Sequence, residues 1–333
     1  MVSKTIVGGS IPSRPASMFK FIFKLAVVIV IIIIAVIYFF GRGQEPEKVD
    51  YGVSFSQKYA QELGLNWQET YLALLDDLGF KKLRLIAYWD LIEPEQGIYN
   101  FQDLDWQIIE ASKRGAQVIL VIGYKIPRWP ECHIPEWASK EDVLEFLEQA
   151  VKHYRDMPTI IAWQVENEPF MPFGICPKLS VKLLDKEIYL VKAFDDRPII
   201  LTDSGELSAW FRASRKSDIF GTTLYKIVWN KYLKYINYPI PAWFYSLRAK
   251  IIRKPIIISE LQAEPWGPKA ITEMSLEEQS KSMSLEKFRE IIEFEKQTGI
   301  SEVYLWGGEW WFWLKNIKGD DSMWEEVKKP YNS

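Results

Sequence analysis

The sequence is poor in the residues that mark metal centres, disulfide-rich scaffolds and nucleic-acid binding. Its 333 residues include only two histidines and two cysteines, and no cluster of metal-ligating residues is visible, so we expect no metal and no other cofactor. Lys and Arg (41) are balanced by Asp and Glu (44), the net charge is −3, and no basic stripe lies beyond the N-terminal region. This charge balance argues against nucleic acid as a partner and favours a neutral or weakly charged substrate. It says nothing about the oligomeric state.

The two cysteines, Cys132 and Cys176, each follow a predicted strand by a few residues. They form a disulfide if the domain faces an oxidising environment, or they stay reduced and pack as small apolar groups. Both interpretations remain open, because a sequence does not supply the Cα separation that a disulfide requires.

The first fifty residues have a different composition from the rest of the chain. An apolar run from Phe21 to Phe40 is interrupted only by Lys24, and as a helix it would rise ~30 Å, about the hydrocarbon thickness of a bilayer. We therefore expect a short N-terminal segment at 1–20, a transmembrane signal-anchor helix at 21–40 and a linker at 41–50. The membrane is then a partner of the chain.

The charges around this run predict its orientation. Basic residues precede it at Lys4, Arg14, Lys20 and Lys24, so the positive-inside bias places the N-terminus in the cytoplasm and the main domain outside the cytoplasm, at the cell membrane. A cleavable signal peptide is the alternative, but the residues after the run, 38–42, offer no small-residue cleavage site. A retained anchor is the preferred interpretation.

From residue 51 onward, short apolar runs alternate with amphipathic stretches, the pattern of repeated βα units. Eight candidate strands begin near Tyr51, Lys82, Gln117, Ile160, Pro198, Asp218, Pro255 and Glu302. Helical periodicity covers 66–78, 104–114, 140–154, 179–194 and 283–297, and Gly79, Gly115 and Gly299 lie just past three of these helices, where glycine closes a helix in the left-handed conformation. These features predict one α/β domain over 51–333, a single (β/α)8 TIM barrel.

Two parts of this assignment have alternatives. A doubly wound open sheet uses the same alternation, but no Gly-rich phosphate fingerprint follows the first strand. The aromatic segment 225–254 could be a sixth helix with a long lid or a surface that rests on a bilayer, and ordinary core packing is the preferred explanation.

Two acidic residues, Glu168 and Glu260, stand where an apolar strand run stops. In a parallel barrel the carboxyl ends of the strands meet at one open face, so we expect the two side chains to share a cleft. Breaking an acetal between sugars requires a proton for the departing oxygen and stabilisation of positive charge at carbon, which needs two carboxyl groups in opposite protonation states. Apolar surroundings can keep one neutral, and hydrogen bonds or a cation such as Arg84 can keep the other ionised.

The chain from Tyr51 to Tyr331 resembles the retaining β-glycosidases of glycoside hydrolase clan A, on the motif Asn167-Glu168-Pro169 and on Glu260 ending the seventh strand. The resemblance implies that Glu168 is the acid/base and Glu260 the nucleophile of a double displacement with retention. It also implies that Asn167 bonds the sugar 2-hydroxyl and that Arg84, Tyr225 and Trp306 hold the nucleophile or form the floor of the sugar site. Retention requires carboxyl groups ~5–5.5 Å apart, whereas inversion leaves ~6.5–9.5 Å.

One departure from the family pattern leaves the subfamily and substrate open. Cellulase-like members often carry histidines after the third strand and two positions before the tyrosine, where this chain has Gly123-Tyr124 and Thr223. The histidines at 133 and 153 do not fit those positions.

Other residues near the strand ends have more ordinary interpretations. Glu166 and Glu264 are expected to support the site from behind or to be solvated. Several tryptophans fall in or near loops on the same face, where an indole can stack on a sugar or simply fill the core: Trp89, Trp129, Trp137, Trp266, Trp310, Trp311 and Trp313.

Together these features predict a membrane-anchored retaining β-glycosidase that hydrolyses a β-linked oligo- or polysaccharide. A non-catalytic glycan-binding barrel and a transglycosylase on the same scaffold are the alternatives, because fold does not fix function. The sugar, the linkage and endo or exo action are not readable from the sequence.

Overall fold

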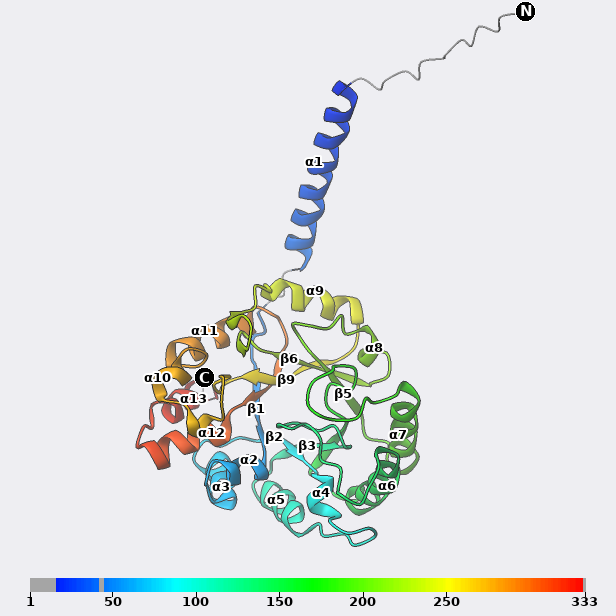
Figure 1. The fold of residues 1–333 in the computed structure, drawn as a ribbon, viewed down its shortest axis with the longest axis vertical. Coiled ribbons are helices and arrows are strands. Elements are labelled where there is room, and N and C mark those ends of the chain that lie inside the picture. The colour runs from blue at the N-terminus through cyan, green and yellow to red at the C-terminus, as the bar shows by residue number, and fades with distance from the viewer. Residues whose placement is uncertain (1–15, 42–44, 332–333) are drawn as a thin grey trace, which may run out of the picture.

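Eight parallel strands close into a barrel in the computed structural model, which describes residues 16–41 and 45–331 (Figure 1). The strands are β1 (Asp50–Phe55), β2 (Lys82–Ile86), β3 (Gln117–Ile122), β4 (Ile160–Val165), β5 (Ile199–Asp203), β6 (Ile219–Leu224), β9 (Ile256–Gln262) and β10 (Glu302–Trp306). They pair in the order β1-β10-β9-β6-β5-β4-β3-β2, each neighbour parallel. The predicted TIM barrel and its eight strands are confirmed.

Helices surround the barrel and short ones line its carboxyl rim. They are α2 (Gln57–Glu62), α3 (Trp67–Asp76), α4 (Trp89–Ile92), α5 (Gln102–Lys113), η1 (Lys140–Asp142), α6 (Val143–Tyr154), α7 (Val181–Phe194), α8 (Phe211–Ser214), α9 (Ala242–Ile252), η2 (Ile271–Glu273), α10 (Leu276–Ser280), α11 (Leu285–Lys296), α12 (Gly308–Trp313), η3 (Leu314–Lys318) and α13 (Ser322–Tyr331). Some of the helices begin with a side-chain cap: at the start of α3, the Asn66 side chain accepts from the backbone N–H of Gln68 and Glu69 at 3.0 and 3.2 Å. At the ends, Gly79, Gly115 and Gly299 adopt positive φ, as predicted.

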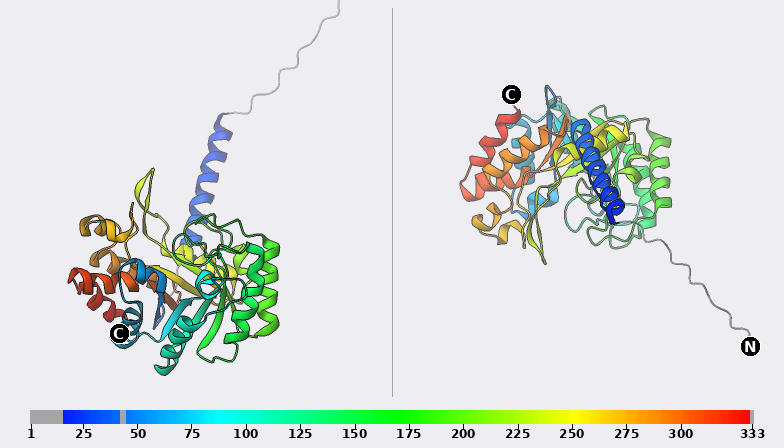
Figure 2. Two further views of the ribbon diagram at one scale, coloured as in Figure 1. Left: turned by 60° about the horizontal axis from the view of Figure 1, so that its bottom comes forward. Right: turned by 90° about the horizontal axis from the view of Figure 1, so that it is seen from above.

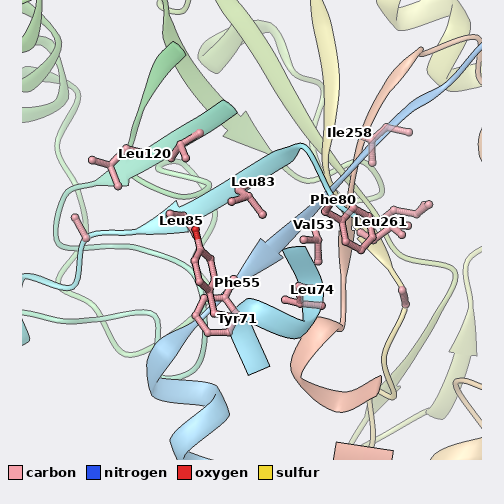
Figure 3. Close-up of a cluster of buried hydrophobic side chains, with 14 of the residues drawn as sticks. Val53, Phe55, Tyr71, Leu74, Phe80, Leu83, Leu85, Leu120, Ile258 and Leu261 are labelled. Carbon is pink, nitrogen blue, oxygen red and sulfur yellow. The ribbon is translucent and has the colours of Figure 1, made fainter. Parts of the chain in front are cut away.

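Alternation along the strands divides the apolar residues into two groups. Val53, Phe55, Leu83 and Leu85 pack outward, in the cluster that also holds Tyr71 and Leu74 of α3 (Figure 3). A separate buried cluster forms from Ile119, Ala162, Ile200, Ile257 and Tyr304, on strands β3, β4, β5, β9 and β10. Two residues beyond Ala162 on β4, the buried amide of Gln164 takes the place of an apolar side chain. Gln164 therefore marks the level at which polar side chains begin inside the barrel.

An N-terminal helix, α1 (Ala16–Gly41), covers the segment predicted to span a membrane. It contacts α9 and projects away from the barrel (Figures 1 and 2). Among residues 16–41 and 45–331, a helix with both the length and the apolar character needed to cross a membrane is not found. The predicted transmembrane helix at 21–40 is therefore not confirmed.

The aromatic segment after β6 differs from its prediction. It forms a two-stranded antiparallel hairpin, β7 (Ile227–Asn230) and β8 (Lys234–Asn237), followed by α9. A sixth helix was one of the alternatives left open by the sequence and is present as α9, whereas the hairpin was not foreseen. The turn between the strands, residues 231–233, contains no glycine, and Lys234 directly after it has φ 60°, so the usual turn signal is missing from the sequence.

Candidate active site

Glu260 lies on β9 and both of its carboxylate oxygens accept hydrogen bonds. Arg84 Nη1 donates to Oε1 at 2.9 Å, and the Tyr225 hydroxyl donates to Oε2 at 2.9 Å. Arg84 is completely buried and Glu260 is nearly so, so this ion pair is shielded from water. The two donors fix the orientation of the carboxylate.

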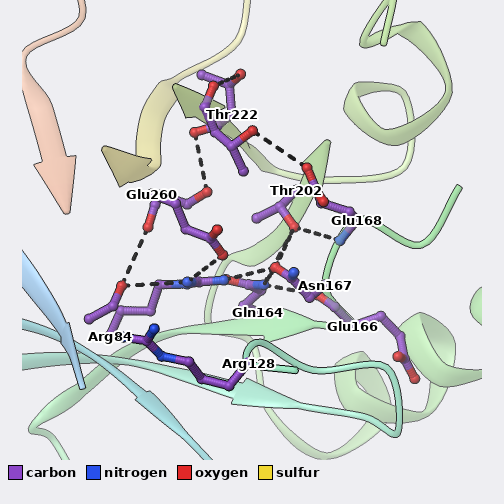
Figure 4. Close-up of polar contacts among 12 residues, drawn as sticks. Arg84, Arg128, Gln164, Glu166, Asn167, Glu168, Thr202, Thr222 and Glu260 are labelled. Atoms are coloured by element: carbon purple, nitrogen blue, oxygen red, sulfur yellow. Dashed lines mark hydrogen bonds and ion pairs between the residues drawn. The ribbon is translucent and has the colours of Figure 1, made fainter. Parts of the chain in front are cut away.

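Asn167 and Glu168 lie just past the end of β4, and Asn167 bonds the same arginine. Arg84 Nη2 donates to Asn167 Oδ1 at 2.9 Å, and the backbone N–H of Glu168 donates to Thr202 Oγ1 on β5 at 2.9 Å. Arg84 thus extends between Glu260 and Asn167, the residue next to Glu168 (Figure 4). The backbone is in the left-handed region at both Glu166 (φ 62°) and Glu168 (φ 43°), a strained arrangement that a barrel keeps where function requires it.

Thr223 lies next to both acids. On β6 it is the register partner of Glu260 on β9, and its hydroxyl is 3.5 Å from Glu168 Oε1, where it can donate. Here a hydroxyl group contacts the acid.

Glu168 is buried, and its surroundings favour the protonated form. Burial is the main cause that raises the pKa of Glu168 well above its ordinary value, and the negative charges of Glu260, Glu131 and Asp203 add to it, while Lys125 opposes them. A carboxylic acid with a raised pKa can hold a proton near neutral pH and donate it.

Three of these charges, Glu131, Asp203 and Lys125, were missed by the sequence analysis. Lys125 Nζ donates to Glu131 Oε2 at 3.0 Å and to the backbone carbonyl of Asn167 at 2.9 Å. Both residues belong to the loop after β3, which a disulfide between Cys132 and Cys176 joins to the loop after β4, with Cα atoms 4.8 Å apart. The structure thus selects the disulfide over two free thiols.

A buried arginine, also missed, packs on Trp306 at the end of β10. The Arg128 guanidinium lies 4.0 Å from the Trp306 ring centroid and 3.7 Å from that of Tyr59, so it is held between two aromatic rings. It forms ion pairs with Glu264 and, at 2.9 Å, with Glu309. Trp306 therefore has a charged neighbour that is itself fixed by two ion pairs.

The two additional acids near the site are buried and not solvated. The Glu166 carboxylate accepts from the backbone N–H groups of Tyr124 and Lys125 at 3.0 and 2.7 Å, and burial raises its pKa to about 8. Burial likewise raises the pKa of Glu264 to about 7, against the effect of Arg128. Both support neighbouring loops.

The tryptophans divide between core and surface. Trp89, Trp310, Trp311 and Trp313 are buried in the hydrophobic core, as the core-filling interpretation expects. Trp129 (71%) and Trp266 (44%) are exposed, and Trp137 is half-buried. Three of these seven tryptophans are therefore at least partly exposed.

No family model matches the chain. A curated β-galactosidase from Xanthomonas manihotis is 28% identical over 170 residues, which cover 44% of this chain and 25% of that protein. The β-galactosidase Bga of Halorubrum lacusprofundi is 25% identical over 122 residues, covering 29% of this chain and 17% of that protein. The matched region is thus a quarter or less of the length of these curated relatives.

Solved structures share the fold at lower identity. A β-galactosidase from Rahnella sp. R3 superposes with a TM-score of 0.58 over 87% of this chain and 56% of that chain, at 12% identity. The comparisons and the closed parallel barrel support a clan A glycoside hydrolase. The family resemblance seen in the sequence is confirmed. Within the described chain, no group of three or more His, Cys, Asp and Glu residues is arranged to hold a metal ion.

Proposed function

We propose that this chain is a retaining β-glycosidase that hydrolyses β-linked sugars, with Glu260 as nucleophile and Glu168 as acid/base. The observation that carries the proposal is the difference between the two acids. Glu260 accepts hydrogen bonds on both oxygens from Arg84 and Tyr225, whereas Glu168 has a raised pKa caused by burial and by neighbouring negative charge. One group is suited to attack and the other to proton donation.

The reaction then proceeds in two steps. Glu260 attacks the anomeric carbon while Glu168 gives its proton to the departing oxygen, and a glycosyl ester forms on Glu260. Water, deprotonated by Glu168, attacks the same carbon and releases the sugar with its configuration retained. In the same proposal, Asn167 bonds the sugar 2-hydroxyl and Trp306 forms the floor under the ring.

Aryl β-glycosides test the roles of the two acids. Glu260→Gln should abolish turnover for every leaving group. Glu168→Gln should lower turnover by about 10²- to 10⁴-fold for alkyl or nitrophenyl leaving groups, but much less for dinitrophenyl glycosides, whose leaving group needs no proton. Equal losses with both classes of leaving group would contradict the roles assigned to the two acids. Unchanged turnover in both variants would show that neither acid is catalytic. NMR of the first-formed product anomer tests retention.

We further propose that α1 attaches the barrel to the cell membrane, with the N-terminus in the cytoplasm and the barrel outside. The support is an exposed apolar surface: from Leu25 to Ile34 the Leu, Val and Ile side chains are 42–59% exposed. Carbonate extraction of membranes should leave the full chain in the pellet and release an Ile29→Asp/Ile33→Asp variant. Recovery of the unaltered chain in the supernatant contradicts the proposal. Digestion of the barrel by protease added to intact cells tests the orientation.

A further inference from the structure

Tyr225, whose hydroxyl donates to Glu260, lies just beyond the part of β6 that the barrel holds. The ladder between β6 and β9 ends at Leu224, which pairs with Leu261, and Tyr225 is the next residue. The hairpin strand β7 begins at Ile227. A residue between two paired segments keeps a fixed position only where other groups hydrogen-bond to its backbone. The direction of the Tyr225 side chain therefore depends on contacts outside the two sheets.

Two side chains, one beyond each strand that flanks β6, accept hydrogen bonds from this segment. Oε1 of Glu206, in the loop after β5, accepts from the Tyr225 N–H at 2.8 Å. Oε1 of Gln262, at the end of β9, accepts from the N–H groups of Lys226 and Ile227 at 2.9 and 3.0 Å. Three successive backbone N–H groups thus donate to side chains, and Glu206 holds the one that belongs to Tyr225.

Glu206 is itself fixed by α9 and by β6. The Tyr245 hydroxyl donates to the same Oε1 at 2.6 Å, and Arg248 Nη2 donates to the backbone carbonyl of Gly205 at 2.6 Å. The Gly205 N–H donates to Thr223 Oγ1 at 3.2 Å, and the Thr223 carbonyl leaves no room for a Cβ atom at Gly205. The loop after β5 therefore packs closely against the end of β6, which makes Glu206 a rigid acceptor.

The ring of Tyr225 has a second neighbour in Trp266, in the loop after β9. The two rings meet edge-on with their centroids 5.3 Å apart, and the indole is 44% exposed. An edge contact with a partly exposed ring is less directional than a hydrogen bond to the backbone. The connection from Glu206 to Glu260 passes through one residue: Tyr225 donates its N–H to the first and its hydroxyl to the second.

We propose that Glu206 is a positioning residue for the glycosidase reaction. It fixes the backbone of Tyr225, and Tyr225 in turn keeps its hydroxyl on Oε2 of Glu260, while Arg84 bonds Oε1. Displacement of a reacting group by about 1 Å can lower the rate by about 10²-fold, so loss of this support should lower activity. The proposal rests on the proposed glycosidase function and adds to it a residue that acts through Tyr225.

Nitrophenol release from single and double variants tests this role. The substrate is whichever of the 4-nitrophenyl β-glycosides of galactose, glucose, mannose and xylose the unaltered chain hydrolyses fastest. Glu206→Met removes the acceptor, keeps the side-chain length and should lower kcat/KM by about 10- to 100-fold. Glu206→Gln keeps an accepting oxygen and should stay within about threefold of the unaltered chain. Glu206→Met/Tyr225→Phe should be no less active than Tyr225→Phe, because the hydroxyl that Glu206 positions is already absent.

Glu295→Met is the matched control. Glu295 on α11 is buried and also accepts a hydrogen bond from a tyrosine hydroxyl, that of Tyr51 near the start of β1, at 2.9 Å. The variant should unfold at lower urea concentration and change kcat/KM by less than about twofold. Equal losses of activity in Glu295→Met and Glu206→Met would show a general effect of stability and overturn the proposal.

Other outcomes also overturn the positioning role and leave the glycosidase function standing. They are losses that multiply in the double variant, an unchanged kcat/KM in Glu206→Met, and equal losses in Glu206→Met and Glu206→Gln. Glu206→Ala takes the place of Glu206→Met in every comparison if the methionine variant does not fold.

If the unaltered chain turns over no aryl glycoside, the glycosidase function fails, and urea unfolding decides the positioning. Tyr225→Phe should then lower the urea midpoint more in the unaltered chain than in Glu206→Met, because the bond from the hydroxyl to Glu260 depends on the fixed backbone. Equal shifts in the two backgrounds overturn the positioning as well.

Discussion

The carboxylate of Glu166 occupies the space in front of Gly123. A Cβ atom added at Gly123 would lie 2.5 Å from Cδ of Glu166, and the glycine has φ +133°, where other residues are strained. The next two backbone N–H groups both donate to that carboxylate. The first turn after β3 is therefore built on a glycine and on an acid that directly follows β4.

Gly123→Ala should lower the free energy of unfolding by about 3 kcal/mol, because the added methyl group both overpacks the site and strains the backbone. Urea unfolding measures this. Gly115→Ala is the control, since Gly115 also has positive φ (+64°) but has no atom within 4 Å of the added Cβ. It should cost about 1–2 kcal/mol. Equal costs at the two positions would show that the contact with Glu166 is unimportant.

Arg84 holds three side chains at once, so its replacement should affect both stability and activity. Arg84→Met leaves Glu260 as a buried charge without its cation and should lower the free energy of unfolding by about 3–5 kcal/mol. Arg84→Lys keeps the charge, so its free energy of unfolding should be higher than that of Arg84→Met. A lysine cannot donate to Gln164, Asn167 and Glu260 together, so kcat/KM should recover less than the free energy of unfolding.

Arg114→Met provides the comparison for Arg84. Arg114 pairs with Asp76 and Glu110 near the surface, where each ion pair contributes about 0–1 kcal/mol. Urea unfolding and kcat/KM on an aryl β-glycoside should therefore be almost unchanged. A loss at Arg114 as large as that at Arg84 would contradict the importance assigned to the buried network.

The positions of the two candidate acids at the strand ends were predictable because their signal is local. Each of Glu168 and Glu260 follows a short β-branched run, and a barrel brings all strand ends to one face. Arg84 could be found for the same reason, since it lies within a strand where side chains alternate in a known way.

Arg128 and Glu131 were not predictable, because they lie in a loop without periodicity. Both adopt positive φ, at 80° and 60°, although neither is a glycine, and a disulfide to another loop fixes the segment. Their positions depend on long-range contacts. The exposure of the tryptophans was not predictable for another reason. Trp311 donates its indole N–H to the Ala263 carbonyl inside the core and Trp129 is exposed, but the sequence does not distinguish the two.

The disulfide connects the loops that carry Glu131 and Glu168, and its removal should destabilise the fold. Cys132 and Cys176 are 44 residues apart, and a closed loop of this size corresponds to about 4 kcal/mol in the chain-entropy description. We expect the Cys132→Ser/Cys176→Ser variant to unfold at lower urea concentration. Peptide mapping without reductant should find the two cysteines in one linked fragment, and recovery of two free thiols from the unreduced chain would contradict the pairing.

The pH dependence of activity should follow the charges around Glu168. Its pKa is raised by burial first and then by Glu260 and Glu131, and lowered by Lys125. Activity needs the protonated acid, so kcat/KM falls as pH rises through this pKa. Glu131→Gln removes a negative charge, lowers the pKa of Glu168 and should move the alkaline limb of kcat/KM to lower pH. Lys125→Met removes a positive charge and should move it to higher pH. The profiles are measured on a nitrophenyl glycoside, whose departure needs the proton, and shifts in the same direction for both variants would show that another group controls this limb.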